Sequence, residues 1–393
     1  MTMEIEANIA GKGLAHIEIH GDQISSVRVV APTDPEELFV SPGFVDIQVN
    51  GFAGIDFSDP ELGPERAISI LPAIWQTGVT TFCPTLVTNS IEQLERNFRV
   101  LEKARRLDAR FAGSVPCYHL EGPYLSPRGA QGAHGTALMR TPDWNEFSRW
   151  QEAAGGNIGI VTLAPELPGA CDFIRRACAA GVVVSLGHTD GTPEHIHAAI
   201  EAGATLSTHL GNGCPELIHR HQNPIWAQLA SDRLQTSLIC DGFHLPPDLI
   251  RVIYQTKGVG GCLLTTDAAY VATLPPGRYF HVGQEIELLH TGQVVTSDRR
   301  CMAGSALSMN RAVTVFESCA GASFADALRA ATRNPGELLH RSGICIDLVP
   351  GQPANLATFR RVPHALRIEA VYLQGRQVSG PSSQKRTVVS LKQ

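Results

Sequence analysis

The stretch SPGFVDIQVNGFAG, residues 41–54, contains an apolar segment that ends in polar residues and a glycine-rich turn. Phe44, Val45 and Ile47 are typical of a buried β-strand. Gln48 and Asn50 lie two positions apart, so their side chains share one face at the point where the strand ends. Two neutral amides therefore occupy a position where many enzymes carry a pair of metal-binding histidines. The role of these amides depends on the polar residues in the rest of the sequence.

The same kind of segment recurs along the chain and predicts the fold. Short apolar runs alternate with amphipathic stretches such as residues 64–78 and 90–106. The runs are residues 43–49, 80–86, 114–122, 158–166, 182–189, 205–212, 236–244 and 262–269. Strands that alternate with helices indicate a parallel α/β architecture, and eight strands close a barrel. We therefore expect a (β/α)8 TIM-type barrel, with helical residues 305–318 and 323–339 after the eighth strand.

The two ends of the chain resemble each other and differ from the middle. Residues 14–30 contain two alternating strand patterns around Gly21-Asp22, and residues 365–379 contain two more around Gln374-Gly375. These patterns predict a small β-sandwich domain that is built from both termini. The expected division is residues 1–41 and 346–393 for the small domain and residues 42–345 for the barrel.

Composition and charge exclude several classes of protein. The 393 residues are 43% apolar and 18% charged, which is typical of a globular chain. A net charge of −6 predicts no broad attraction to nucleic acid or to an anionic membrane. The ten cysteines form no CxxC pair, and no stretch approaches the roughly 20 apolar residues of a membrane span. We therefore expect a cytoplasmic protein that binds neither membrane nor nucleic acid.

Polar and ionisable residues recur where the predicted strands end. In a (β/α)8 barrel all these ends meet on one face, where active sites are built. Any one of these residues alone is better explained as a hydrogen-bonded core residue or a turn cap. Together they indicate a site, because independent structural residues would not choose the same end of different strands. They are Gln48, Asn50, His119, Glu121, His188, His209, Asp241, His244 and Asp267.

Three of these residues form a candidate metal site. Glu121, His188 and His209 offer one carboxylate and two imidazoles, which is the ligand set of a catalytic Zn2+ site with an open position for water. A divalent metal makes hydroxide available near neutral pH. A further carboxylate, Asp267, can accept the proton of that water and pass it to a leaving group. The combination predicts metal-assisted hydrolysis of an amide or ester-like bond.

Six motifs in this order resemble those of the amidohydrolase superfamily and, within it, the N-acetylglucosamine-6-phosphate deacetylases. They are HLEGPYLS (119–126), GHT (187–189), THLGN (208–212), DGFH (241–244), TTDA (265–268) and MAGSALSM (302–309). The resemblance extends over nearly the whole chain, from PGFVD (42–46) to LVPGQPANLATF (348–359). It implies that Glu121, His188 and His209 are metal ligands and that Asp267 is the catalytic acid and base.

The resemblance also implies a set of residues that bind the substrate. His134 would lie close to the acetyl group, the preceding Ala133 would also contact the substrate, and His244 would lie near the sugar phosphate. Family members act as homodimers in which an arginine of one subunit binds the phosphate in the other. The remaining implied contacts are Asn212, Gly213, Met302, Ala303, Gly304 and Ser305.

The chain departs from the family pattern after the sixth predicted strand. The family usually has an aromatic residue followed by Asn-Ala-Met there, whereas this chain reads HLGNGCP at 209–215. Arg220 lies near the expected position of the phosphate-binding arginine, but His219 and His221 flank it. Arg220 is therefore either the phosphate clamp or a surface residue beside a remodelled pocket. A loop of this composition suits a phosphorylated, neutral or carboxylated substrate.

The leading hypothesis is deacetylation of N-acetylglucosamine 6-phosphate to glucosamine 6-phosphate and acetate. In this hypothesis a metal hydroxide attacks the acetamide and Asp267 serves as acid and base. The alternative enzyme hydrolyses the same bond in an unphosphorylated N-acetyl sugar or another N-acyl substrate. The alternative outside the enzymes is a non-catalytic scaffold protein that forms dimers. The choice between sugar epimers depends on about one hydrogen bond from the loops around the sugar.

The resemblance implies that Gln48 and Asn50 stand at a second metal-binding position of the superfamily. Many superfamily members carry His-x-His at the end of the first strand and bind a second metal there. Amides bind transition metals far less well than imidazole does, so we expect one divalent metal per chain and no use of the second position. Zn2+ is the first expectation for that metal, and the ligand set also suits Fe2+, Mn2+, Co2+ or Ni2+.

Overall fold

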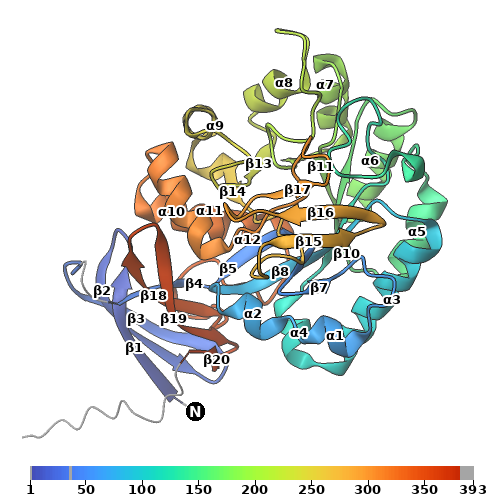
Figure 1. The fold of residues 1–393 in the computed structure, drawn as a ribbon. Helices are drawn as coiled ribbons and strands as arrows, with labels where there is room; N and C mark the ends of the chain where they lie inside the picture. Colours follow the sequence, from blue (N-terminus) through green and yellow to red (C-terminus); the bar gives the residue numbers. More distant parts are fainter. Residues whose placement is uncertain (1, 35–37, 381–393) are drawn as a thin grey trace, which may run out of the picture.

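A computed structural model describes residues 2–34 and 38–380, and residues 381–393 of the expected C-terminal segment lie outside the described part. Its central feature is an eight-stranded parallel sheet in the order β14-β13-β12-β11-β10-β9-β8-β5 (Figure 1). The strands are β5 (Phe44–Val49), β8 (Val79–Val87), β9 (Tyr118–Glu121), β10 (Ile158–Leu163), β11 (Val183–Leu186), β12 (Leu206–Ser207), β13 (Gln235–Leu238) and β14 (Cys262–Leu264). Each expected strand is present.

The last residues of β5 and the residues just beyond β14 close the sheet into a barrel. Val49 and Ala268 form a parallel bridge, and the Asp267 N–H donates to the carbonyl oxygen of Gln48 at 3.0 Å. The first and last strands of the sheet therefore meet. The predicted (β/α)8 barrel is confirmed.

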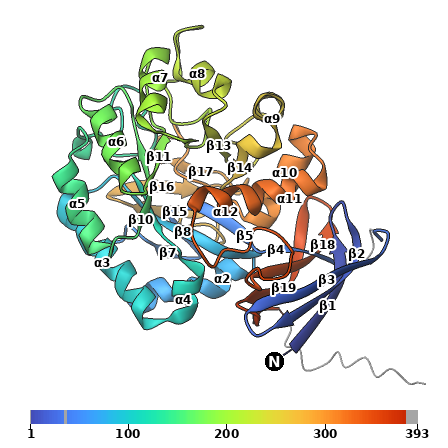
Figure 2. The same cartoon turned by 180° about the vertical axis from the view of Figure 1, so that it is seen from behind.

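Helices surround this barrel in both views of the molecule (Figures 1 and 2). They are α1 (Pro64–Ile68), α2 (Leu71–Trp75), α3 (Ile91–Leu107), α4 (Ala109–Ser114), η1 (Thr136–Leu138), α5 (Trp144–Ala153), α6 (Ala170–Ala179), α7 (Pro193–Ala202), α8 (Pro224–Ala230), α9 (Pro247–Gly261), α10 (Met309–Ala320), α11 (Phe324–Ala331) and α12 (Arg333–Leu339). Several begin at side-chain caps that satisfy free backbone N–H groups, as Ser90, Asp143 and Asn223 do for α3, α5 and α8.

Burial explains why these segments form a parallel barrel. Every residue of β5, β8 and β10 is buried, as expected for strands covered on both faces. One buried cluster joins Val45, Ile47 and Leu263 of the strands to Leu338 and Leu339 of α12. The part of the barrel that contacts α12 is therefore filled with apolar side chains, and polar groups concentrate at the carboxyl ends of the strands.

The small domain lies beside the barrel and combines both ends of the chain (Figures 1 and 2). Its seven strands hydrogen-bond in the order β20-β19-β18-β4-β1-β2-β3, so the two termini share one continuous sheet. The strands are β1 (Thr2–Ile9), β2 (Gly13–His20), β3 (Gln23–Ala31), β4 (Phe39–Pro42), β18 (Leu356–Val362), β19 (Ala365–Leu373) and β20 (Arg376–Ser379). Both expected strand pairs and their turns are present.

Two short sheets were not anticipated. One contains β6 (Gly51–Phe52) and β7 (Ile55–Asp56), directly after β5. The other contains β15 (Gly277–His281), β16 (Gln284–Leu288) and β17 (Val294–Thr296), between β14 and α10. These three strands lie in front of the barrel in Figure 1 and behind it in Figure 2. Residues 277–296 therefore form an insert over one end of the barrel.

None of the helices in the described part of the chain is both long enough and apolar enough to cross a bilayer.

Candidate metal centre and active-site cavity

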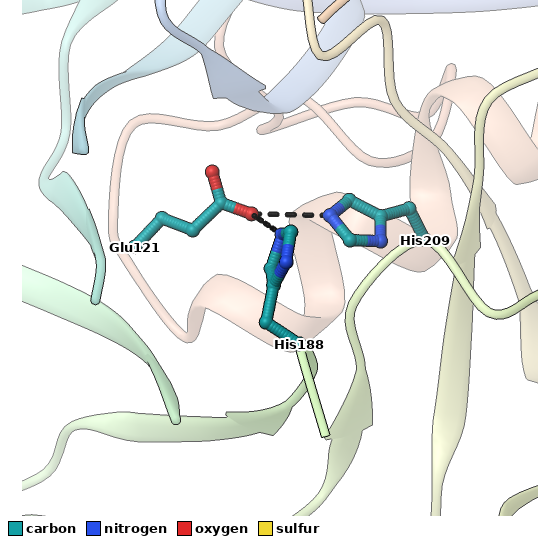
Figure 3. A group of neighbouring side chains, drawn as sticks. All are labelled: Glu121, His188 and His209. Carbon is teal, nitrogen blue, oxygen red and sulfur yellow. Dashed lines mark hydrogen bonds and ion pairs between the residues drawn. The ribbon is translucent and has the colours of Figure 1, made fainter. Parts of the chain in front are cut away.

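Three buried side chains from different strands converge at the carboxyl end of the barrel (Figure 3). Glu121 is the last residue of β9, and His188 and His209 follow β11 and β12 by two residues each. One ligand atom from each residue lies within 4.8 Å of the others, a distance at which all three can contact one ion. The structure thus brings together the residues that the sequence indicated.

Both imidazoles face the carboxylate, and a backbone hydrogen bond orients the ring of His188. His188 Nδ1 lies 2.9 Å from the carbonyl oxygen of Ala130, which only accepts, so Nδ1 carries the proton and Nε2 faces Glu121. The Nε2 atoms of His188 and His209 lie 3.3 and 3.1 Å from the same oxygen, Glu121 Oε1. Burial alone would raise the pKa of Glu121, but the two histidines hold it well below its usual value. A carboxylate oxygen facing two imidazole nitrogens fits a divalent metal.

The backbone at these positions has an uncommon conformation. His188, His209 and Asp267 have φ angles of 48°, 31° and 48°, in the left-handed region that non-glycine residues rarely adopt. Such a conformation costs of order 1 kcal/mol or more per residue and persists only where the surroundings enforce it. Three such residues, just beyond the ends of β11, β12 and β14, indicate a functional site.

Asp267 is held by the two amides of the opening stretch. Gln48 Nε2 donates to Asp267 Oδ1 at 3.0 Å and to Glu121 Oε1 at 2.9 Å, and Asn50 Nδ2 donates to Asp267 Oδ1 at 2.7 Å. Burial, together with the nearby negative charge of Glu121, raises the pKa of Asp267 to about 6. A carboxyl group with a pKa in this range can both accept and return a proton near neutral pH.

A cavity of about 770 Å³ opens above the cluster and is large enough for a small ligand. Besides the three cluster residues, Asn50 and Asp267 line it. Most of the expected substrate contacts line it as well: Ala133, His134, Asn212, Gly213, His244, Met302, Ala303 and Gly304.

Two glycines of this lining permit close packing around the site. Gly213 has a φ of 58°, and a Cβ there would lie 3.0 Å from Nδ1 of His188. Gly304 has a φ of 65°, and a Cβ there would lie 2.9 Å from the carbonyl oxygen of Asp267. Both positions therefore require glycine, on conformational and on steric grounds.

Two histidines of the cavity wall are fixed by neighbouring polar groups. His134 Nδ1 lies 3.0 Å from Thr88 Oγ1, and burial, with the nearby His188, lowers the pKa of His134 to about 3, so this imidazole is neutral. His244 Nδ1 lies 2.7 Å from Asp241 Oδ2, which orients the ring. Both rings are thus held in one orientation.

Some residues singled out from the sequence lie elsewhere. Arg220 is exposed and outside the cavity lining. Ser305 is fully buried behind the wall, where its hydroxyl donates to the carbonyl oxygen of Thr266. His119 contacts Ile47 O and Thr162 Oγ1 in the barrel core and does not line the cavity.

The unexpected insert also contributes to the cavity. His281 from β15 and Gln284 from β16 line it, and the Gln284 amide donates to the carbonyl oxygen of Ala133. The alternation of residues 277–288 around Val282-Gly283 was the available signal for this hairpin. The sequence gives no sign that the hairpin folds over the barrel end.

Comparison with known proteins identifies the family. Residues 39–378 match the model of the amidohydrolase family. A zebrafish (Danio rerio) N-acetylglucosamine-6-phosphate deacetylase is 33% identical over 88% of this chain and 85% of its own length. An N-acetylgalactosamine-6-phosphate deacetylase of Escherichia coli O157:H7 is 30% identical over 89% of this chain and 90% of its own.

A solved structure agrees with these matches. A mutant N-acetyl-D-glucosamine-6-phosphate deacetylase from Mycobacterium smegmatis, in complex with N-acetyl-D-glucosamine-6-phosphate, superposes with a TM-score of 0.84. It shares 31% sequence identity, and the match covers 96% of this chain and 98% of that one. The chain belongs to the amidohydrolase family and, within it, to the N-acetylglucosamine-6-phosphate deacetylases.

Proposed function

We propose that this protein is a metal-dependent deacetylase that converts N-acetylglucosamine 6-phosphate to glucosamine 6-phosphate and acetate. The observation that carries the proposal is the convergence of Glu121, His188 and His209 beside Asp267 in one cavity, in a chain of this family. The names of the relatives support the substrate class.

In this proposal the metal ligands, Asp267 and His134 have separate chemical roles. A divalent metal held by Glu121, His188 and His209 supplies a Lewis acid that polarises the acetamide carbonyl and makes water acidic. Asp267 accepts a proton from the attacking water and then donates it to the departing amine. His134, held by Thr88, lies beside the cluster and holds the acetamide oxygen.

The remaining lining residues bind the sugar. Asn212, Gly213 and residues 302–304, which line the cavity, would contact the ring, and His244, which also lines it, would contact the phosphate. Ser305 supports this segment from behind, because its N–H donates to the carbonyl oxygen of Asp267 at 2.9 Å. The metal is Zn2+ in this proposal, with one ion per chain, because Gln48 and Asn50 supply amides at the second position.

A homodimer is part of the proposal. Leu217 and Trp226 are 93% and 50% exposed on the segment that carries Arg220, next to Pro215 and Ile218 of the cavity lining. Apolar side chains that surround an exposed arginine beside a cavity suit an interface. Arg220 of one subunit would then contact the phosphate in the other. All ten cysteines are free, which suits the reducing cytoplasm that we propose as the location.

Acetate release from a panel of sugars tests the function. The panel contains N-acetylglucosamine 6-phosphate, its galactosamine epimer and unphosphorylated N-acetylglucosamine. We expect the phosphate to raise kcat/KM by at least about a hundredfold, and Arg220→Ala to reduce that preference. Arg233→Ala is the control, because Arg233 is paired with Glu201 and lies outside the cavity lining.

Other results would point to the alternative functions. Equal rates with and without the phosphate would favour an unphosphorylated N-acyl substrate. A faster rate on the galactosamine epimer would transfer the assignment to the activity named for the Escherichia coli relative. Metal-loaded protein that releases no acetate from any member of the panel would contradict the enzyme and favour a scaffold.

A further inference from the structure

A histidine on the insert lies in the cavity wall and is bound to a buried carboxylate. His281, the last residue of β15, lines the cavity, and its Nδ1 lies 2.8 Å from Oδ2 of Asp56 on β7. Both side chains are only 11% exposed. The Tyr270 ring stacks on the His281 ring with 6.0 Å between centroids. The imidazole is thus fixed in position and direction.

This pairing determines which atom faces the cavity. A carboxylate only accepts hydrogen bonds, so His281 Nδ1 carries a proton and donates it to Asp56. Asp56 is itself anchored, because its Oδ1 accepts from the Ser58 N–H at 2.8 Å. His281 Nε2 has no hydrogen-bond partner within residues 2–34 and 38–380. A buried, oriented imidazole with a free nitrogen in a cavity wall is suited to bind a ligand.

The neighbouring groups locate His281 relative to the reaction. Burial alone would lower the pKa of His281, but the carboxylates of Asp56 and, at longer range, Asp267 raise it above its usual value. Burial, His188 and His281 act together in lowering the pKa of His134. The geometry agrees, because His281 pairs with Gln284 across the turn of the hairpin, and the Gln284 amide donates to the carbonyl oxygen of Ala133, the residue before His134. His281 therefore lies near the segment that carries His134, which holds the acetamide in the proposed function.

We propose that His281 Nε2 hydrogen-bonds a sugar hydroxyl adjacent to the acetamido carbon, and that Asp56 is the positioning residue that orients this imidazole. The inference rests on the proposed function and adds a substrate contact to it. In a 2-acetamido sugar the hydroxyls on carbons 1 and 3 flank the reacting group, whereas the phosphate on carbon 6 is remote. A hydroxyl both donates and accepts, so it matches either protonation state of Nε2.

A purely structural role is the competing explanation. The contact between His281 and Asp56 joins β15 of the insert to β7, and it could serve only to hold the insert over the barrel. In that case the loss of His281 would lower stability and affect all substrates alike. A substrate contact instead predicts a loss that depends on one hydroxyl.

Steady-state kinetics with deoxy analogues tests the proposal. The metal-loaded variants are His281→Ala, His281→Gln and Asp56→Asn, and the substrates are N-acetylglucosamine 6-phosphate and its 1-deoxy and 3-deoxy analogues. Asp56→Asn retains an oxygen for the Ser58 N–H and removes the charge that faces His281. Asp59→Asn is the matched control, because Asp59 lies three residues further along the chain but pairs with Arg66.

The expected pattern is specific to one hydroxyl. His281→Ala lowers kcat/KM on the full substrate about tenfold to a hundredfold, mainly through KM, because one buried hydrogen bond is lost. Asp56→Asn lowers it less, and Asp59→Asn leaves it unchanged. Wild-type protein discriminates against one deoxy analogue, and His281→Ala removes most of that discrimination.

Two results would overturn the proposal. The first is that both His281 variants keep the wild-type kcat/KM on the full substrate. The second is that removing either hydroxyl from the substrate lowers kcat/KM by the same factor in the wild type and in the variant. His281→Gln and Asp56→Asn provide the test if His281→Ala does not fold. The turnover of the wild-type protein tests the proposed function, whereas the ratio of kcat/KM in the variant to kcat/KM in the wild type tests the role of His281. Failure of the proposed function can therefore be distinguished from failure of this inference.

Discussion

The side-chain amide of Gln48 donates to Oδ1 of Asp267 at 3.0 Å, and the same nitrogen donates to Oε1 of Glu121 at 2.9 Å. Both hydrogens of the amide are therefore used, one on a candidate metal ligand and one on the candidate acid and base. Asn50 adds a second hydrogen bond to the same oxygen of Asp267. The end of β5 thus supplies donors that orient two carboxylates, where a His-x-His pair would supply metal ligands.

This arrangement predicts one metal ion per chain. An amide nitrogen has no lone pair to offer a cation, and the neutral amide oxygens of Gln48 and Asn50 bind transition metals far less well than imidazole does. Elemental analysis of protein purified without chelator should give a ratio near one, and a chelator should abolish activity until metal returns. Glu121→Gln should lower the affinity for the metal, because a charged ligand becomes neutral. Two tightly bound ions per chain would contradict the prediction.

Asp267→Asn should abolish most of the deacetylation while the metal remains bound. The substitution keeps the shape of the side chain but removes the site of proton transfer, and general acid-base catalysis contributes about a hundredfold to ten-thousandfold. Acetate release should fall by at least about a hundredfold, with metal content and melting temperature close to wild type. Near wild-type turnover would exclude Asp267 as the acid and base.

The activity should decrease at acidic pH. Asp267 must be ionised to accept a proton, and burial with the neighbouring Glu121 raises its pKa to about 6. A bound cation lowers that pKa, so the acidic limb of kcat/KM should have its midpoint at or below about pH 6. Asn50→Leu removes a hydrogen bond that favours the ionised form and should move the midpoint upward. A midpoint that stays in place or moves down would show that another group controls this limb.

A second buried carboxyl group predicts a pH-dependent stability. Asp46 accepts hydrogen bonds from the hydroxyls of Thr265 and Thr266 at 2.8 and 2.6 Å, yet burial raises its pKa to about 6. The folded chain therefore binds a proton between about pH 4 and pH 6 that the unfolded chain has released. The contribution of Asp46 to the free energy of unfolding is largest below about pH 4. It falls by roughly 3 kcal/mol as the pH rises through about 6.

Comparison with Asp46→Asn isolates this contribution. The variant cannot ionise at this position, and other groups cancel in the difference. Chemical denaturation at several pH values should show that the stability of wild type relative to Asp46→Asn declines as the pH rises from about 4 to 7. A difference that is constant or increases with pH would contradict the raised pKa.

The architecture and the chemistry of the site were readable from the order of residues. Eight buried runs alternate with amphipathic ones, and burial on both faces forces such runs to be apolar throughout, so the barrel is evident locally. Polar residues at the ends of those runs, such as Glu121 and His209, stand out for the same reason. The alternating patterns at residues 14–30 and 365–379 likewise predicted the strand pairs that the structure contains.

Only the tertiary structure decided how distant groups meet. The sequence showed two amides at the end of the first strand, but their donation to Asp267 and Glu121 depends on closure of the barrel, which brings β5 against β14. The contact of His281 with Asp56 joins residues 225 positions apart through an insert whose placement no local pattern encodes. Local propensity and burial specify the strands and their polar ends, whereas the partner of each polar group depends on how the closed chain packs.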